Sequence, residues 1–269
     1  MADLLIHSMA EFAPILTGAL EIASAANIVE IGAEFGGTTP MLAAHAEQKG
    51  GTLTSVDPAP KQEFVDWVAA NPHVRHLAAP SLDVIGDCAD VDAWFIDGDH
   101  NWYTVYHELK AIDGVCARDG KPLLVFLHDV SWPCGRRDSY YAPDRIPAEF
   151  RQPYDYEGGA TPDHAGLVPG GGFRGMGQFA WAVHEGGERN GVLTAVEDFM
   201  TEAGRDLAFA QVPAVFGLGI LFDHHAEWSE ALGRFVLPYH RNTLLASLER
   251  NRLANYLRVI EMQDMAAAA

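Results

Sequence analysis

Apolar and polar positions follow two recurring patterns in the first half of the chain. Short runs rich in Val, Ile, Leu and Phe alternate with longer segments in which apolar residues recur at helical spacing. This succession predicts an α/β fold, a Rossmann-like, doubly wound and mainly parallel sheet. Strands are predicted at 27–31, 52–57, 74–78, 91–97 and 123–129. A helix is predicted over 8–25, and others are expected to begin near residues 37, 61, 81 and 102.

The second half of the chain has a different texture. Residues 132–190 are rich in Pro, Gly, Arg and Tyr and show little periodicity, which predicts a lid or binding insertion. A partly disordered surface insertion is the alternative. Beyond it we expect a helix over 192–203 and two strands, 207–214 and 215–222, that follow each other too closely for a crossover and are therefore antiparallel. Residues 241–263 predict a C-terminal amphipathic helix. Without a linker or repeat, residues 1–269 are expected to form a single domain.

Composition narrows the classes of partner. Of the 269 residues, 18 are Lys or Arg and 37 are Asp or Glu, so the formal net charge is −19. Such a surface repels phosphate backbones and anionic lipids, which predicts no nucleic-acid and no membrane partner and favours a small or cationic ligand or a metal ion. The apolar runs are far shorter than the roughly 20 residues that cross a bilayer. The N-terminus has no basic segment of a secretory signal, so a cytoplasmic protein is expected.

The three cysteines do not form a recognisable framework. Cys88, Cys116 and Cys134 are odd in number and widely spaced, and no CxxC pair is present. This pattern argues against disulfides and against a thiolate zinc site. We expect reduced, structural cysteines.

The first predicted strand runs into a glycine turn, VEIGAEFGGTT, at residues 29–39. Gly32 and Gly36 let the backbone approach a ligand, and the helix that follows offers unpaired N–H groups. The turn is not the GxGxxG of dinucleotide-binding folds. Glu30 and Glu34 place carboxylates where two phosphates would lie, which disfavours NAD and favours a cofactor that carries a positive charge.

The second strand ends at Asp57, where an acidic side chain can accept both hydroxyls of a ribose. An acidic residue, a glycine turn and this aspartate together resemble the class I S-adenosylmethionine-dependent methyltransferases. The resemblance implies that Glu30 and the turn from Gly32 to Gly36, with Glu34 inside it, hold the methionine end of the cofactor. It implies that Asp57 holds the ribose and that the segment around Ser81 holds the adenine. An ordinary strand-to-helix turn with charged neighbours is the alternative.

Two further strands end in titratable residues. The fourth delivers DGDH, with Asp97, Asp99 and His100, and the fifth delivers HD, His128 and Asp129. If these strands are parallel neighbours, the side chains converge on one edge of the sheet. Carboxylate and imidazole ligands suit a divalent ion of the Mg or Mn type, and a histidine moves the preference towards Mn, Fe or Zn. Asp99 is expected to be a turn or N-cap residue.

The DGDH and HD pair resembles the macrocin-type O-methyltransferase and cephalosporin hydroxylase-like branch of that family, over about the first 130 residues. The resemblance implies a metal bound by Asp97, His128 and Asp129, with Asp97 also bordering the cofactor. At His128 several members of the branch carry a carboxylate instead. The expected function is therefore metal-assisted O-methylation of a sugar-like or secondary-metabolite hydroxyl, with His100 as general base and Asp129 beside it. Metal-independent N- or C-methylation and a non-catalytic binding module are the alternatives.

The segment behind the fifth strand, SWPCGRRDSYY, is expected to cover a small-molecule acceptor. Its aromatic rings offer flat apolar walls for a ring or sugar. Arg136 and Arg137 either donate to the acceptor or pair with some of the many acidic residues. The C-terminal helix packs on the body or pairs with a second chain, so a homo-oligomer is expected.

Overall fold

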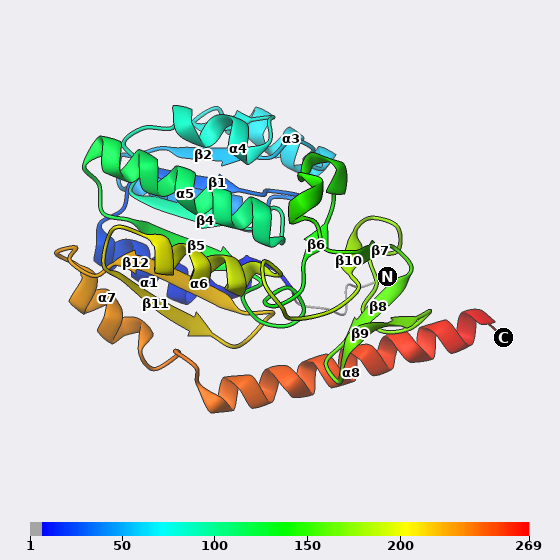
Figure 1. Cartoon of the computed structure of the whole chain (residues 1–269). Coiled ribbons are helices and arrows are strands. Elements are labelled where there is room, and N and C mark those ends of the chain that lie inside the picture. Colours follow the sequence, from blue (N-terminus) through cyan, green and yellow to red (C-terminus); the bar gives the residue numbers. More distant parts are fainter. Residues whose placement is uncertain (1–6, 269) are drawn as a thin grey trace.

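The computed structural model describes residues 7–268 of the chain. Figure 1 shows a central sheet with helices on both faces and a long C-terminal helix that runs beyond the sheet. Part of the N-terminal segment for which no secretory signal is predicted, residues 1–6, lies outside the described residues. So does residue 269, the last of the predicted single domain.

Seven strands form the main sheet in the order β11-β12-β5-β4-β1-β2-β3. The strands from β1 to β5 are parallel, whereas β12 is antiparallel to both β5 and β11. The predicted fold class is therefore confirmed, including the terminal antiparallel pair. The strands are β1 (Ile28–Ile31), β2 (Leu53–Val56), β3 (Val74–Leu77), β4 (Ala93–Ile96), β5 (Leu124–His128), β11 (Leu207–Val212) and β12 (Leu218–Asp223). Residues 213–217, predicted to belong to the two last strands, form the turn between them.

Helices follow the predicted strand-to-helix alternation. The helices that pack around the sheet are α1 (Ala13–Ala23), α2 (Thr39–Gln48), α3 (Gln62–Ala70), α4 (Ser81–Val84), α5 (Trp102–Asp119), α6 (Val192–Glu202) and α7 (Ser229–Val236). A 3-10 turn, η1 (Met9–Phe12), precedes α1, and η2 (Ile85–Asp87) continues α4. Of the two roles predicted for Asp99, a turn or an N-cap residue, the N-cap of α5 is excluded, because Asn101 takes it and its side chain accepts from the amide of Thr104. Asp99 lies in the loop between β4 and α5.

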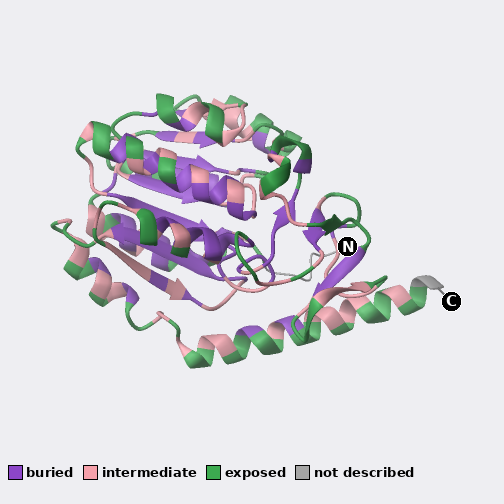
Figure 2. Cartoon of the chain, viewed as in Figure 1, coloured by how far each residue is buried: buried purple, intermediate pink, exposed green. Residues whose placement is uncertain are grey.

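The sheet separates two apolar layers. On one face Val29 and Ile31 pack in a cluster with α5 and α6, and on the other Ile28 packs with α1, α2 and α7. Every residue of β1, β4 and β5 is buried, and Figure 2 shows the central strands as a continuous buried layer. Strands covered on both faces read as unbroken apolar runs, which is why the sequence pattern located them.

The insertion over 132–190 is built of small sheets. Strand β10 (Ala180–Ala182) lies between β6 (Ser139–Tyr140) and β7 (Tyr154–Asp155), and β8 (Gly158–Thr161) pairs with β9 (His164–Pro169). Two 3-10 turns, η3 (Pro143–Arg145) and η4 (Ala148–Phe150), lie between β6 and β7. These strands are too short and irregular to give a periodic pattern in the sequence. The sequence therefore predicted a lid or binding insertion without any strands.

The two insertion arginines have partners within the protein. Arg137 is fully buried and donates to the carbonyls of Ala182 and Ala165. Arg136 forms a two-pronged ion pair with Glu197 of α6. Of the two uses considered for these side chains, the structure supports internal pairing rather than contact with an acceptor.

The last helix, α8 (Thr243–Ala268), extends beyond the predicted end at residue 263. Glu249 and Leu253 are buried against the body, whereas Leu244, Leu248 and Met262 are exposed. The three cysteines are buried and free, in agreement with the sequence expectation. Within residues 7–268, none of the helices is long and apolar enough to cross a membrane.

Candidate functional site

The direction of strand addition reverses between β1 and β4. From β1 the chain moves through β2 to the edge strand β3, then returns to place β4 on the other side of β1. In open α/β sheets such a switch point, at the carboxyl ends of the strands, is where ligands bind. Ile31 pairs with Ile96, so Gly32 and Asp97 leave the sheet side by side, and the Asp97 amide donates to the Ile31 carbonyl at 2.8 Å.

The glycine turn is shaped by its neighbours in the chain. Gly32 has a φ of 88°, and a Cβ there would lie 2.3 Å from the carbonyl oxygen of Asp97. Position 32 thus requires glycine because the backbone after β4 approaches the backbone after β1 at this point. The sequence alone suggested that a ligand approaches there. Asp57 braces the turn: its Oδ2 accepts from the amides of Ala33 at 3.0 Å and Glu34 at 2.9 Å.

Glu30 lies beneath this turn and is 2% exposed. Its Oε2 accepts from the hydroxyls of Thr39, in the first turn of α2, at 2.7 Å and Ser55 at 2.8 Å. Burial raises the pKa of Glu30 to about 7, the two hydroxyls oppose that rise, and the charges of Asp97 and Asp57 add to it. The charges of Asp97 and Asp57 therefore disfavour the ionised form of Glu30, and a cation placed among the three carboxyl groups would favour it.

Ser81 begins α4 and contacts an acidic residue that the sequence did not single out. Its hydroxyl donates to Oε1 of Glu108 on α5 at 2.5 Å. Glu108 is fully buried, and within the described chain its Oε2 has no hydrogen-bond partner. Burial raises the pKa of Glu108 to about 8, and the charge of Asp99 adds to the rise. Glu108 falls within the apolar stripe of its helix, at spacing three and four from Val105 and Ile112, and that position was the available signal.

His100 lies next to two of the predicted site carboxylates. Its Nε2 is 3.5 Å from Asp129 Oδ2 and 4.0 Å from Asp97 Oδ1, and the side chain is 12% exposed. The ring of Tyr141, from the insertion, lies 6.5 Å from the His100 ring. The structure thus brings the predicted base, its carboxylate and one aromatic wall together.

His128 is held from both sides of its ring. Nε2 lies 2.9 Å from the carbonyl oxygen of Val215, and Nδ1 lies 3.0 Å from Asp97 Oδ1 and 3.6 Å from Asp129 Oδ1. Burial would lower the pKa of His128, but the charges of Asp97 and Asp129 outweigh it and raise the pKa to about 9. The raised pKa favours the imidazolium form of His128, in which Nε2 donates to the Val215 carbonyl and Nδ1 to Asp97. The Val215 carbonyl is a main-chain partner for which the sequence held no signal.

This arrangement bears on the predicted metal ligands, Asp97, His128 and Asp129. They lie together, but an imidazolium has no free lone pair for a metal ion. Over residues 7–268, no group of three or more His, Cys, Asp or Glu side chains is arranged to hold a metal. As the side chains stand, they do not fit a resident divalent ion, and the protonated His128 supplies the positive charge between the two aspartates.

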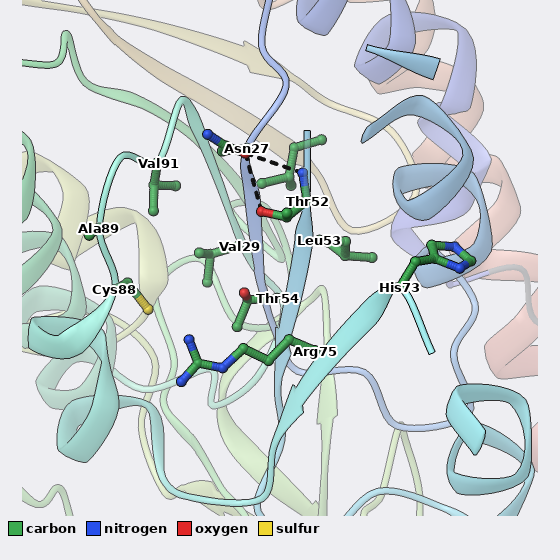
Figure 3. A pocket seen from close by; sticks show the side chains of 11 residues that line it. Asn27, Val29, Thr52, Leu53, Thr54, His73, Arg75, Cys88, Ala89 and Val91 are labelled. Atoms are coloured by element: carbon green, nitrogen blue, oxygen red, sulfur yellow. Dashed lines mark hydrogen bonds between the residues drawn. The ribbon is translucent and has the colours of Figure 1, made fainter. Parts of the chain in front are cut away.

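A cavity elsewhere in the fold does not include the site. Figure 3 shows it at the amino ends of β1 and β2, where Asn27 accepts from the amide and hydroxyl of Thr52. Arg75 and Cys88 also line it. The predicted site residues lie at the carboxyl ends of the strands, at the opposite end of the sheet. This cavity therefore has no part in the chemistry considered below.

Comparison with known proteins decides the class of the domain. Residues 29–130 match the family model described as "Methyltransferase domain". The segment is less than half of the chain, and the enzyme class that it supports is that of the S-adenosylmethionine-dependent methyltransferases. The match confirms the predicted enzyme class and spans every site residue from Glu30 to Asp129. The predicted branch of the family stays a prediction. No curated protein matches the sequence.

Several solved structures show similarity to this chain. One, assigned as a caffeoyl-CoA O-methyltransferase from Staphylococcus aureus, has 14% identity, covers 79% of this chain and 83% of its own, and has a TM-score of 0.47. One assigned as an O-methyltransferase from Klebsiella pneumoniae has 16% identity, coverages of 80% and 81%, and a TM-score of 0.47. An S-adenosylhomocysteine-bound methyltransferase from Podospora anserina has 13% identity, coverages of 79% and 76%, and a TM-score of 0.46.

Proposed function

We propose that the protein transfers a methyl group from S-adenosylmethionine to a hydroxyl oxygen of a small-molecule acceptor. The observation that carries this proposal is the set of acidic side chains, Glu30, Asp57 and Asp97, at the switch point of the sheet. The cofactor brings a sulfonium and an ammonium group, which such a set attracts. A dinucleotide would bring two phosphates, which it repels.

The chain's residues suit the parts of this cofactor. Asp57 stands where a ribose diol would be accepted, and Glu30 and Glu34, with Gly32 and Gly36, surround the place for the methionine end. Ser81 borders the place for the adenine, and Asp97 lies between the cofactor and the acceptor. The bound cofactor supplies an electrophilic methyl group, and the protein has to align the acceptor with it and remove one proton.

His100 is proposed as the general base. Its Nε2 would take the proton of the acceptor hydroxyl, and Asp129 Oδ2, 3.5 Å away, would stabilise the imidazolium that forms. The Tyr141 ring beside it offers a flat wall to a sugar-like or secondary-metabolite acceptor. We expect His100→Gln to lower transfer by about 100-fold or more on any hydroxyl acceptor that the wild type methylates, with S-adenosylhomocysteine affinity unchanged. A non-catalytic binding module predicts no transfer by either protein.

Metal assistance through Asp97, His128 and Asp129 is the competing mechanism. It requires His128 Nδ1 to lose its proton and to bind a metal ion in place of its contacts with Asp97 and Asp129. A metal-free reaction, including the alternative of N- or C-methylation, does not.

Calorimetric titration with S-adenosylhomocysteine, after exhaustive EDTA treatment and again with added Mn²⁺ or Mg²⁺, tests the proposal. We expect saturable binding with one site per chain under both conditions. The absence of heat in both conditions would reject the cofactor assignment, and binding or turnover only with metal would favour the metal mechanism.

The exposed leucines of α8 support a homo-oligomer. Leu244 and Leu248 are 66% and 58% exposed and lie one helical turn apart. Light scattering on Leu244→Glu/Leu248→Glu checks this. The double variant is expected to be a monomer and the wild type a larger species, and equal masses contradict the expectation.

A further inference from the structure

The turn between β11 and β12 holds strained residues beside His128. Val215 has a φ of 46° and Phe216 a φ of 63°, in the left-handed region that β-branched and bulky residues avoid. Asp129, directly after His128, also has a positive φ, 61°. Outliers of this kind persist only where surrounding contacts hold them, and they gather at functional sites. The contacts that hold this turn are therefore informative.

The strained turn points a carbonyl group at the site. Val215 O lies 2.9 Å from His128 Nε2, and because a carbonyl oxygen only accepts, Nε2 carries a hydrogen. Nδ1, on the other side of the ring, then faces Asp97 Oδ1 at 3.0 Å. The position of the Val215 carbonyl thus fixes the orientation of the His128 ring between β5 and the turn.

Glu249, on α8, holds the turn from behind. Its Oε1 accepts from the amide of Phe216 at 2.9 Å. Arg252 donates to both carboxylate oxygens, Nε to Oε2 and Nη2 to Oε1, each at 2.7 Å. The same guanidinium lies 4.9 Å from the centroid of the Phe216 ring. Glu249 is only 8% exposed, so its carboxylate is buried between the helix and the turn.

The turn also contacts the insertion. The Phe216 ring stacks on Phe173 with centroids 5.7 Å apart, and Phe173 contacts Tyr256 of α8 at 6.0 Å. Behind the turn, the amide of Ser131 donates to the Phe216 carbonyl at 2.7 Å. Displacement of Phe216 would therefore move the chain that follows β5 as well as the carbonyl that holds His128.

We infer that Glu249 is a positioning residue for the reaction: it keeps the Val215–Phe216 turn in its strained conformation and thereby holds the His128 ring against Asp97. The inference rests on the proposed function, which places Asp97, the partner of His128 Nδ1, between the cofactor and the acceptor. It places α8, far outside the matched segment 29–130, among the elements that the site requires.

The test measures the exchange rate of the His128 Nε2–H proton with water by NMR at one fixed pH. The signal is assigned by its absence in His128→Gln. Glu249→Ala removes the acceptor for the Phe216 amide, and Glu249→Gln keeps an acceptor oxygen but loses the ionic pair with Arg252. Glu261→Gln is the matched control, because Glu261 pairs with Arg258 at the same spacing on the exposed part of α8.

We expect Glu249→Gln to exchange about fivefold faster than the wild type and Glu249→Ala at least about tenfold faster, with Glu261→Gln unchanged. If Glu249→Ala does not fold, the Glu249→Gln rate decides. A wild-type rate in Glu249→Gln overturns the inference, even if its melting temperature falls, because that is the result of a merely structural role. S-adenosylhomocysteine affinity, measured on the same samples, should stay within about twofold of wild type. If the wild type does not bind S-adenosylhomocysteine, the proposed function is rejected, but the conclusion about Glu249 still holds.

Discussion

At the scale of single residues, the chemistry of the site comes from where each strand ends. Glu30, Asp57 and Asp97 are ordinary carboxylates that become a cation-attracting set because β1, β2 and β4 are parallel and adjacent. Burial and the charges of Asp97 and Asp57 raise the pKa of Glu30 to about 7. His128 shows the opposite balance, because the charges of Asp97 and Asp129 outweigh its burial and raise its pKa.

The role of Asp57 can be separated from its bracing of the glycine turn. We expect Asp57→Asn to weaken S-adenosylhomocysteine binding by about tenfold or more, because bonds to a charged acceptor are stronger than bonds to a neutral one. Asp92→Asn is the control: Asp92 likewise accepts from two backbone amides, those of Ala26 and Asn27, but at the opposite edge of the sheet. Calorimetry on the two variants checks this, and equal affinities would show that Asp57 only supports the fold.

At the scale of elements, the sequence located the strands and helices around the sheet because their apolar patterns are long and regular. The site residues that end strands, from Glu30 to Asp129, followed directly from those strand positions. Glu108 was missed because a carboxylate in the middle of a helix is usually solvated, although the apolar residues at spacing three and four from it indicated a buried position. Val215 and Glu249 were beyond sequence reasoning, since one acts through its main chain and the other through a contact 33 residues away along the chain.

The buried carboxyl of α5 predicts a pH effect on stability. The folded chain keeps the Glu108 proton up to a pKa of about 8, whereas the unfolded chain loses it near the ordinary glutamate value of 4.5. The stabilising contribution is therefore complete at low pH and is lost as the pH rises from about 4.5 to about 8. Thermal unfolding of Glu108→Gln is expected to show a melting temperature that rises relative to wild type across this range. Glu47→Gln, an exposed substitution on α2, should follow the wild type, and a parallel Glu108→Gln curve would show that Glu108 is already ionised.

At the scale of the whole molecule, three distant parts of the chain meet beyond the carboxyl ends of the strands. The sheet supplies the carboxylates and both histidines, the insertion supplies Tyr141, and α8 supplies Glu249. A net charge of −19 surrounds them, so a positively charged donor is attracted from outside the site as well as within it.

That electrostatic attraction predicts a difference between cofactor and product. S-adenosylmethionine carries one more positive charge than S-adenosylhomocysteine and is otherwise nearly the same molecule. Raising the ionic strength from about 0.05 M to about 0.5 M should weaken binding of the methionine form about threefold more than binding of the homocysteine form. Calorimetry with both ligands measures this, and identical salt dependences would mean that the acidic residues do not sense the sulfonium charge.

A crystal structure of the protein with S-adenosylhomocysteine bound would locate the cofactor on the sheet. We expect density between the ends of β1 and β4, with the ribose hydroxyls on Asp57, the amino-acid end beside Glu30 and the adenine near Ser81. Density at any other place, or an empty switch point at saturating ligand, would contradict it.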